Sequence, residues 1–315
     1  MRILITGASG FIGSHLWPKL VDLDHEVFAL ERYVTGRYVL GKETGLGKVF
    51  ADLNDPAAIR RTVREVQPEA IIHLASISPV SYSYDHPLEV LETNFTATVN
   101  LAEAAMREVH HFKQFLFAST SETYGNGPNP KREDAPQVPN SPYSVSKVAS
   151  EDYLRYMSDA YKFPVTLLRP FNTYGRTENT HFVVERTIYQ MLTSKRVQLG
   201  DPKPVRDLLY VDDHVNAYIT CLDNAKAIGE TLNFCTGRGV TIKELAWMTA
   251  RVCRFRGEIR WRQIPSRPLD IMELVGDSSK ARRMLGWKPK YTLEEGLRLT
   301  ADAWREVIAS RSRAA

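Results

Sequence analysis

The sequence of 315 residues has little cysteine and no long hydrophobic run. Its apolar stretches fall short of the roughly 18 residues that a membrane-spanning helix needs, so we expect no membrane span. Three cysteines (Cys221, Cys235 and Cys253) are too few and too widely spaced for a disulfide framework or a metal site. The first residues enter a strand-like segment at once and leave no room for a signal peptide. Together these features predict a cytoplasmic protein with reduced, packed thiols and no metal.

An excess of charge of one sign is also lacking. The 41 Lys and Arg residues against 37 Asp and Glu residues give a formal charge of +4, which is too small to indicate a nucleic-acid partner. Positive charge is concentrated only between Arg251 and Arg267, where six arginines fall. This run is compatible with a solvated face, with an anion site for a diphosphate, or with a weak polyanion-binding surface.

The first two-thirds of the chain alternates short apolar runs with longer amphipathic ones. We predict strands at Arg2–Thr6, Glu26–Leu30, Lys48–Ala51, Ala70–Leu74, Gln114–Ser119 and Val165–Arg169. Helical patterns lie between them at Gly10–Leu23, Pro56–Val66, Pro87–Glu108 and Ser141–Tyr161. Such alternation predicts an α/β fold: a doubly wound parallel sheet with helices on both faces.

The pattern changes after Pro170. Short elements and scattered Gly, Pro and Arg follow, and helical patterns resume at Thr241–Cys253, Ser278–Leu285 and Leu293–Ile308. We therefore expect a dinucleotide-binding domain at residues 1–170, with a returning segment at about 207–235. Residues 171–206 and 236–315 would form a smaller α/β substrate lobe.

A glycine-rich turn follows the first strand and opens a helix. In Thr6–Gly13, Gly7 allows a tight turn, Gly10 lets the backbone approach a pyrophosphate, and Gly13 lets helix and strand pack closely. The start of the helix supplies free N–H groups and a partial positive charge for phosphates. Three glycines in such a turn can also be purely structural, so the turn alone is weak evidence for a dinucleotide.

An acidic residue after the second strand supports the dinucleotide. Glu31 lies 18 residues after Gly13, near the position of the acid that holds the adenosine ribose hydroxyls. A carboxylate there repels a 2′-phosphate and favours NAD, although Arg32 and Arg37 lie close enough in sequence to hold that phosphate. Asp52 is a candidate for the adenine amino group or for a helix cap. His73 is interpreted as a packed histidine.

Tyr143 and Lys147 stand four residues apart on a predicted helix and therefore project from one face. A free tyrosine, with a pKa near 10, is a poor base at neutral pH. A neighbouring ammonium group and an oxidised nicotinamide ring both favour the phenolate. Together with the glycine turn and the Ser/Thr-rich segment 118–122, this pair predicts oxidation of a carbinol next to NAD.

These motifs give the chain a resemblance to a known family. TGASGFIG at Thr6–Gly13, HLA at His73–Ala75, STSETYG at Ser119–Gly125 and SPYSVSK at Ser141–Lys147 are followed by RPFNTYG at Arg169–Gly175, RDLLYVDDH at Arg206–His214 and LGWKP at Leu285–Pro289. The series, in this order over nearly the whole chain, resembles the extended short-chain dehydrogenase/reductases that act as NAD-dependent nucleotide-sugar epimerases and dehydratases.

The resemblance implies roles for individual residues. Tyr143 would be the base on the sugar C4 hydroxyl, Lys147 its partner, and Thr120 a hydrogen-bonding residue to the same hydroxyl. The implied coenzyme-binding residues are Gly7, Gly10, Phe11, Ile12, Gly13, Glu31, Arg32, Asp52, Leu53, Leu74, Ala75, Ser76, Ser119, Tyr143, Lys147 and Pro170. The implied substrate-binding residues are Ser121, Asn172, Arg206 and Arg267, the two arginines holding the diphosphate. A salt bridge of Arg206 with Asp207 or Asp212 remains an alternative.

Glu122 is the residue that distinguishes between the possible reactions. A 4-epimerase oxidises C4, turns the keto sugar and reduces it again without a further base, and the 4-epimerases of this family usually carry a small residue at this position. A 4,6-dehydratase needs a base for the C5 proton, and Thr120-Ser121-Glu122 resembles the Thr-Ser-Glu of GDP-mannose-type and N-acetylhexosamine dehydratases. The Asp of dTDP-glucose dehydratases is replaced by Ser121, which leaves the acid for the C6 hydroxyl open.

A 4,6-dehydratase is therefore the favoured interpretation, and a 4-epimerase is the main alternative. UDP-glucuronate decarboxylases and 4-keto-sugar reductases share similar sequences at this strand end. An inactive NAD-binding regulator would be expected to have lost Tyr143, Lys147 or Thr120, and all three are present. The resemblance also implies a homodimer formed through the helices at Pro87–Glu108 and Ser141–Tyr161, although the same apolar residues suit a core.

Overall fold

The computed structural model describes residues 1–32, 46–177 and 179–314, and its centre is a seven-stranded parallel sheet. The strand order is β10-β6-β5-β4-β1-β2-β3. The strands are β1 (Arg2–Thr6), β2 (Glu26–Glu31), β3 (Leu46–Phe50), β4 (Ala70–His73), β5 (Gln114–Ala118), β6 (Val165–Pro170) and β10 (Thr231–Phe234). This is the doubly wound fold predicted from the sequence. The chain reverses direction across the sheet between β1 and β4, where such folds place their ligands.

Helices cover both faces of this sheet. One apolar cluster unites the strands with α1 (Phe11–Asp22), α8 (Val211–Cys221) and α10 (Ser279–Leu285). A second cluster on the other face contains α2 (Pro56–Val66), α5 (Ala97–Glu108) and α6 (Pro142–Tyr161). The β4 side chains are buried throughout, as expected for a parallel strand covered on both faces.

Local sequence fixes where two of these helices begin. Asp55 caps α2 by accepting hydrogen bonds from the backbone N–H groups of Ala57 and Ala58, each at 3.0 Å. Ser141 caps α6, accepting from Ser144 N at 3.1 Å, and Pro142 follows at the first helical position. Proline loses no hydrogen bond at that position. The serine cap and the proline together determine where the helix that carries Tyr143 and Lys147 begins.

The predicted helix at Pro87–Glu108 is interrupted. It consists of α4 (Pro87–Leu91), a π-helical turn η2 (Glu92–Thr96) and α5. The turn is tied to two other segments by Asn94, which accepts from Ile77 N at 2.8 Å and donates to Ser146 Oγ at 3.0 Å. Before α4 the chain forms the short helix α3 (Val80–Asp85).

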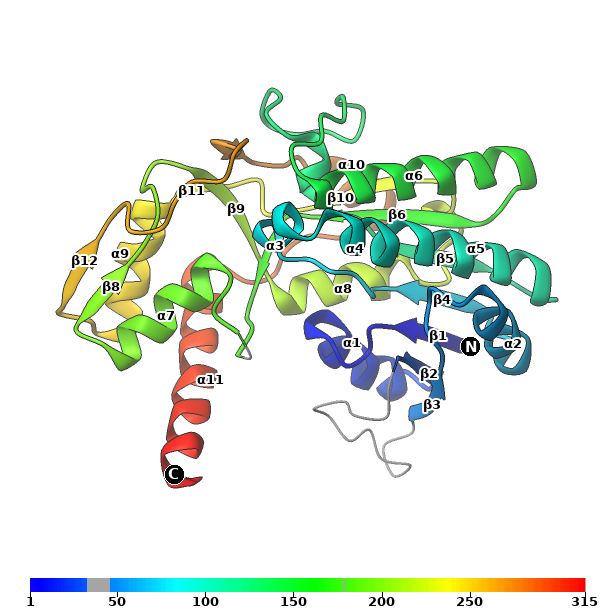
Figure 1. Ribbon diagram of the computed structural model, residues 1–315, viewed down its shortest axis with the longest axis horizontal. Helices are drawn as coiled ribbons and strands as arrows, with labels where there is room; N and C mark the ends of the chain where they lie inside the picture. The colour runs from blue at the N-terminus through cyan, green and yellow to red at the C-terminus, as the bar shows by residue number, and fades with distance from the viewer. Residues whose placement is uncertain (33–45, 178, 315) are drawn as a thin grey trace.

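The remaining elements gather at one end of the molecule. β7 (Asn172–Tyr174), β9 (Val205–Tyr210), β11 (Gly239–Thr241) and β13 (Glu273–Leu274) form a second sheet around β9, and β8 (Arg196–Gln198) pairs with β12 (Glu258–Arg260). Their core also contains α7 (Val183–Thr193), α9 (Ile242–Cys253) and α11 (Leu293–Ala314). Figure 1 shows α11, in red, projecting away from this end. The part of the chain that the structure describes also contains two 3₁₀ turns, η3 (Ser121–Tyr124) and η4 (Ala225–Ala227).

Two expectations about composition can be compared with this fold. Cys221, Cys235 and Cys253 are free thiols and all are buried, as predicted. Over residues 1–32, 46–177 and 179–314, no helix combines the length and the apolar character that crossing a bilayer requires.

Candidate active site

A cleft of about 740 Å³ opens at the carboxyl ends of β1, β4, β5 and β6, where the strand order reverses. Most of the predicted site residues line it: Gly7, Gly10, Phe11, Ile12, Gly13, Leu74, Ala75, Ser76, Ser119, Thr120, Ser121, Glu122, Tyr143, Lys147, Pro170, Asn172, Arg206 and Arg267. Glu31, Arg32, Asp52 and Leu53 are not part of its lining and lie by the ends of β2 and β3. The fold thus brings the glycine turn, the Tyr–Lys pair and two arginines to one cleft.

The glycine turn has the form that a pyrophosphate needs. Gly7 has a positive φ of 72°, and its carbonyl oxygen accepts from Gly10 N at 3.0 Å. A Cβ atom on Gly13 would lie 2.2 Å from Gly7 O, so no side chain fits there. Because α1 starts at Phe11, its first N–H groups face the cleft beside the turn. The turn therefore fits the diphosphate of a dinucleotide.

Glu31, the acid expected to bind the ribose, also forms hydrogen bonds with the glycine turn. Glu31 accepts from Ser9 N at 3.2 Å and from Ser9 Oγ at 2.8 Å. Arg32 forms a salt bridge with Asp52 at 3.0 Å. The helix-cap alternative for Asp52 is wrong, because Asp55 caps α2 and Asp52 accepts from Asn54 N instead. Arg37 lies outside the described residues.

Tyr143 is 8% exposed and forms a hydrogen bond with Thr120. Burial raises the pKa of Tyr143 above its ordinary value; the bond to Thr120 acts in the opposite direction, Glu122 raises the pKa further, and Arg176 lowers it. The tyrosine is therefore a neutral phenol in this form of the protein. It needs additional positive charge nearby before it can act as a base.

Lys147 lies on the same face of α6 but points to the end of β5. Its Nζ donates to the carbonyl oxygen of Ala118 at 2.7 Å and lies 4.8 Å from the centre of the Phe117 ring. Burial lowers the pKa of Lys147 to about 7, against the opposing effect of Glu151. The charge of this lysine is therefore poised near neutral pH, where a small change of surroundings alters it.

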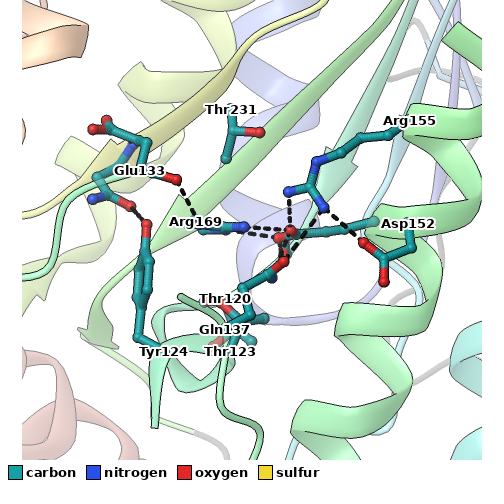
Figure 2. Close-up of polar contacts among 12 residues, drawn as sticks. Thr120, Thr123, Tyr124, Glu133, Gln137, Asp152, Arg155, Arg169 and Thr231 are labelled. Atoms are coloured by element: carbon teal, nitrogen blue, oxygen red, sulfur yellow. Dashed lines mark hydrogen bonds and ion pairs between the residues drawn. The ribbon is translucent and has the colours of Figure 1, made fainter. Parts of the chain in front are cut away.

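A buried ionic network supports this arrangement from behind. Glu151, one helical turn after Lys147, accepts from Arg169 Nε at 2.8 Å, from Gln137 Nε2 at 2.8 Å and also from the Ser119 hydroxyl. Arg155 binds the same carboxylate as Arg169. Figure 2 shows the labelled side chains of Arg155 and Arg169 extending towards each other. The network connects α6 to the residue that precedes Thr120.

Glu122 lies in η3 and lines the cleft. Its backbone N–H donates to Thr120 Oγ1 at 3.2 Å, the side chain is 6% exposed, and within the described residues Oε2 has no hydrogen-bond partner. Burial lowers the pKa of Arg267, but the negative charge of Glu122 more than offsets this with help from Asp270, so the pKa lies above its ordinary value. Burial lowers the pKa of Arg206 below its ordinary value, and Glu122 opposes this only in part. Burying a carboxylate oxygen without a hydrogen-bond donor destabilises a folded protein. We therefore infer that a ligand supplies the partner of this oxygen.

The two arginines expected to bind diphosphate share a carboxylate. Asp270 Oδ1 accepts from Arg267 Nη2 at 2.6 Å and from Arg206 Nη2 at 3.4 Å. The alternative salt bridges of Arg206 are wrong: Asp207 accepts from Thr236 and Gly237, and Asp212 pairs with Lys19. Arg267 is the member of the arginine run 251–267 that lines the cleft.

Several residues of the cleft and its surroundings were not expected from the sequence. The Arg176 guanidinium lies over the rings of Phe11 and Phe182, at 4.2 and 3.7 Å from their centres, and donates to Thr173 O. Asp270 and Glu151 were missed as well, although the spacing of Glu151 from Lys147 places both on one helix face. His73 is packed as predicted, between the hydroxyls of Thr6 and Thr98.

Comparison with known proteins agrees with this geometry. The sequence profile of the GDP-mannose 4,6-dehydratase family matches residues 4–300. The chain belongs to this family. Its members include the extended short-chain dehydrogenase/reductases that the motifs resembled, so the family inferred from the sequence is confirmed, and the chain is an enzyme that acts on nucleotide sugars.

Individual relatives carry different activities, among them 4,6-dehydratases, 4-epimerases and a GDP-6-deoxy-D-mannose reductase. The chain is 31% identical to a dTDP-glucose 4,6-dehydratase of Xanthomonas campestris, over 95% of this chain and 92% of that protein. A UDP-glucose 4-epimerase structure from Thermotoga maritima with UDP-glucose has a TM-score of 0.91 and 31% identity, over 98% and 100% of the two chains. A Thermus thermophilus UDP-glucose 4-epimerase with NAD has a TM-score of 0.88 and 33% identity, over 97% and 99%. The bound NAD agrees with the coenzyme expected from the sequence.

Proposed function

We propose that this enzyme is an NAD-dependent nucleotide-sugar 4,6-dehydratase. Residues 1–170, with the returning segment at about 207–235, hold NAD, and residues 171–206 and 236–315 hold the nucleotide sugar. Bound NAD would supply a site that takes up a hydride and gives it back, so no external reductant would be consumed. The observation that carries the choice of reaction is the buried, unpartnered Oε2 of Glu122 in the same cleft as Tyr143.

The first role of the protein is to remove the proton of the C4 hydroxyl. Tyr143 takes this proton, and Thr120, which is hydrogen-bonded to Tyr143, holds the same hydroxyl in place. Lys147 stabilises the phenolate by its charge. Loss of the C4 hydrogen as hydride then leaves a ketone at C4.

The ketone makes the C5 hydrogen acidic, and the next step needs a carboxylate base. Glu122 takes the C5 proton while the C6–O bond breaks, and the departing hydroxyl leaves as water after gaining one proton. With Ser121 at the neighbouring position, the protonated Glu122 supplies that proton. Return of the hydride to C6 and protonation of C5 from solvent through Glu122 complete a 6-deoxy-4-keto sugar. Tyr143 releases the proton of the C4 hydroxyl to solvent, so the net change is the loss of one water.

Substrate binding relies on the positive charge of two arginines that line the cleft. Arg206 and Arg267 bind the diphosphate, replacing the contact that both make with Asp270. Ser121 and Asn172 face the sugar, and the buried Asn172 Oδ1 has no partner within the described residues. An unpaired acceptor of this kind suits a sugar hydroxyl.

A UDP-glucose 4-epimerase is the second candidate, because two of the similar structures described above carry that activity. The two reactions share Tyr143, Lys147 and Thr120 and differ after the ketone forms. An epimerase must turn its keto sugar within the cleft and has no use for a base at C5. The position of Glu122 therefore favours the dehydratase.

Incubation in heavy water distinguishes the dehydratase from the epimerase. The protein is incubated with UDP-, GDP- and dTDP-hexoses in D₂O, and the products are examined by NMR. We expect a 6-deoxy-4-keto sugar with deuterium at C5 from one of the nucleotide classes. A C4-inverted hexose without solvent deuterium would overturn the dehydratase and support the epimerase.

We further propose that the enzyme is a cytoplasmic homodimer. Large apolar side chains remain exposed on α4 and α6: Leu88 at 74%, Val145 at 43% and Tyr156 at 51%. A face of this kind on two neighbouring helices suits the burial of a second copy. Sedimentation of the wild type and of Leu88→Lys tests it, and a monomeric wild type would contradict it.

A further inference from the structure

Two buried polar atoms on α8 line the cleft and take no part in the proposed chemistry. His214 is 5% exposed and Tyr218 is fully buried, and both belong to the cleft lining. Among the residues that the structure describes, neither His214 Nε2 nor the Tyr218 hydroxyl has a hydrogen-bond partner. Two orphaned polar groups one helical turn apart, beside a ligand cleft, indicate a ligand that supplies their partners.

The hydrogen bonds around His214 decide which of its nitrogens carries a proton. The Thr173 hydroxyl donates to Phe171 O at 3.0 Å, so its single hydrogen is already used. His214 Nδ1, 2.9 Å from Thr173 Oγ1, must therefore be the donor in that contact. Burial, with a smaller effect of Arg176, lowers the pKa of His214 to about 3, so the ring is neutral. Nε2 consequently presents a lone pair, which is a hydrogen-bond acceptor.

Tyr218 complements this acceptor with a donor. Its ring is stacked against the His214 ring, with centres 5.3 Å apart and an angle of 26° between the planes. Burial raises the pKa of Tyr218 above its ordinary value, so its hydroxyl keeps its proton. An acceptor and a donor on two stacked rings form the complement of a primary carboxamide, which carries an N–H donor and a C=O acceptor on one carbon.

The location of the pair identifies which carboxamide it would meet. Tyr218 belongs to the apolar cluster that includes α1 and the end of β5, and α8 is tied to α1 by the salt bridge between Lys19 and Asp212 at 2.7 Å. The pair thus lies on the coenzyme side of the cleft. Tyr218 and Tyr143 line the same cleft.

The chemistry of hydride transfer places the carboxamide in this region. The carbinol carbon next to Tyr143 must come within about 3.5 Å of C4 of the nicotinamide ring. The carboxamide is attached to C3, the adjacent ring carbon. A nicotinamide positioned for reaction therefore carries its carboxamide close to Tyr143.

We propose that His214 and Tyr218 recognise the nicotinamide carboxamide of NAD, with His214 Nε2 accepting from its amide N–H and the Tyr218 hydroxyl donating to its carbonyl oxygen. The pair fixes the orientation of the ring in the cleft, and Thr173 fixes the tautomer of the histidine. The inference rests on the proposed use of NAD and is independent of which sugar reaction follows.

Coenzyme analogues test this pair by binding, without turnover. Titration calorimetry compares NAD with its 3-acetylpyridine analogue, in which a methyl ketone keeps the carbonyl oxygen and loses the N–H donor. The wild type should bind NAD about tenfold more tightly than the analogue, the effect of one hydrogen bond. His214→Phe keeps an aromatic ring against Tyr218. It should bind NAD about tenfold more weakly than the wild type does and leave the affinity for the analogue nearly unchanged, so the preference for NAD disappears.

Tyr218→Phe provides the matched control. It removes the donor to the carbonyl oxygen, which both coenzymes possess, so both should bind several-fold more weakly while the tenfold preference for NAD remains. Thermal unfolding of the coenzyme-free variants, with melting temperatures like that of the wild type, verifies that each still folds.

The outcomes separate this inference from the proposed function. Equal binding of the two coenzymes by the wild type, or an unchanged preference in His214→Phe, would overturn the recognition of the carboxamide. Either result would leave NAD as the coenzyme, with a water or a sugar hydroxyl as the partner of the pair. Failure of the wild type to bind NAD at all would overturn the proposed function as well.

Discussion

Lys147 Nζ donates a hydrogen bond of 2.7 Å to the carbonyl oxygen of Ala118. Through this bond, the helix that carries Tyr143 is fastened to the strand end that leads into Thr120. The lysine thus has two functions: it holds two segments together, and as an ammonium group it supplies charge to a buried phenol. Because it is buried, its protonation must influence both stability and activity.

The stability of the coenzyme-free protein should depend on pH through Lys147. Its pKa is about 7 in the folded state, against an ordinary value of 10.5. Between these two pH values the unfolded chain binds one proton more than the folded chain. The destabilisation caused by burying the ammonium is therefore complete below about pH 7 and disappears as the pH rises towards 10.5. A single group of this kind contributes a slope of about 1.4 kcal/mol per pH unit.

Urea unfolding at pH 7 to 9.5 measures this slope. The wild type should gain free energy of unfolding with rising pH relative to Lys147→Met, which has a similar length and no proton to exchange. The other titrating groups cancel in the difference between the two proteins. Parallel pH dependences would show that Lys147 keeps an ordinary pKa.

Glu122→Gln should stop the reaction after oxidation at C4. The amide has nearly the shape of the carboxylate but cannot take the C5 proton, so formation of the 6-deoxy-4-keto product should fall by about 100-fold or more. Reduced coenzyme should accumulate, seen as absorbance of the dihydronicotinamide. Tyr143→Phe is the matched control, since it should yield neither product nor reduced coenzyme. An active Glu122→Gln variant would assign the C5 proton to another residue.

Much of this site could be predicted because its parts are local in sequence. The glycine turn is encoded by three residues within one strand-to-helix connection, and Tyr143 and Lys147 are related by the spacing of a single helix. The parallel sheet follows similarly from short apolar runs alternating with helical patterns. Each of these features depends on neighbours a few residues away, and each appears in the structure at nearly the expected residues.

Other features depend on distant partners and could not be predicted. The π-helical turn at Glu92–Thr96 is tied to Ile77 and Ser146 through Asn94, and nothing in the local pattern distinguishes it from an ordinary helix. Asp270 meets Arg206 across 64 positions of sequence. The expected partners of Arg206 were its near neighbours, whose carboxylates are already used by Thr236 and Lys19.

Asp270→Asn should tighten the binding of nucleoside diphosphates. In the structure the carboxylate competes for the two arginines that would bind the diphosphate, and an asparagine neutralises that competitor while keeping its size. Calorimetric titration with UDP, GDP and dTDP should show a several-fold lower Kd for whichever nucleotide the wild type binds. The gain should be smaller at high salt, because the attraction is electrostatic. Weaker binding would indicate that Asp270 contacts the ligand or is needed to orient the arginines.

Glu31 should set the preference for NAD over NADP. Its carboxylate is placed beside the glycine turn by two hydrogen bonds from Ser9, at 3.2 and 2.8 Å, and a 2′-phosphate would meet this negative charge. Glu31→Ala removes the repulsion together with the ribose contacts. We expect NAD to bind about tenfold more weakly and NADP about as well as before or better, so that the ratio of their Kd values falls by at least tenfold. Ser9→Ala tests the turn separately: it removes the hydroxyl that fastens Glu31 but keeps the carboxylate, so NAD binding should weaken while the preference over NADP persists. If Glu31→Ala retains the full preference, selection against the 2′-phosphate must come from elsewhere in the chain.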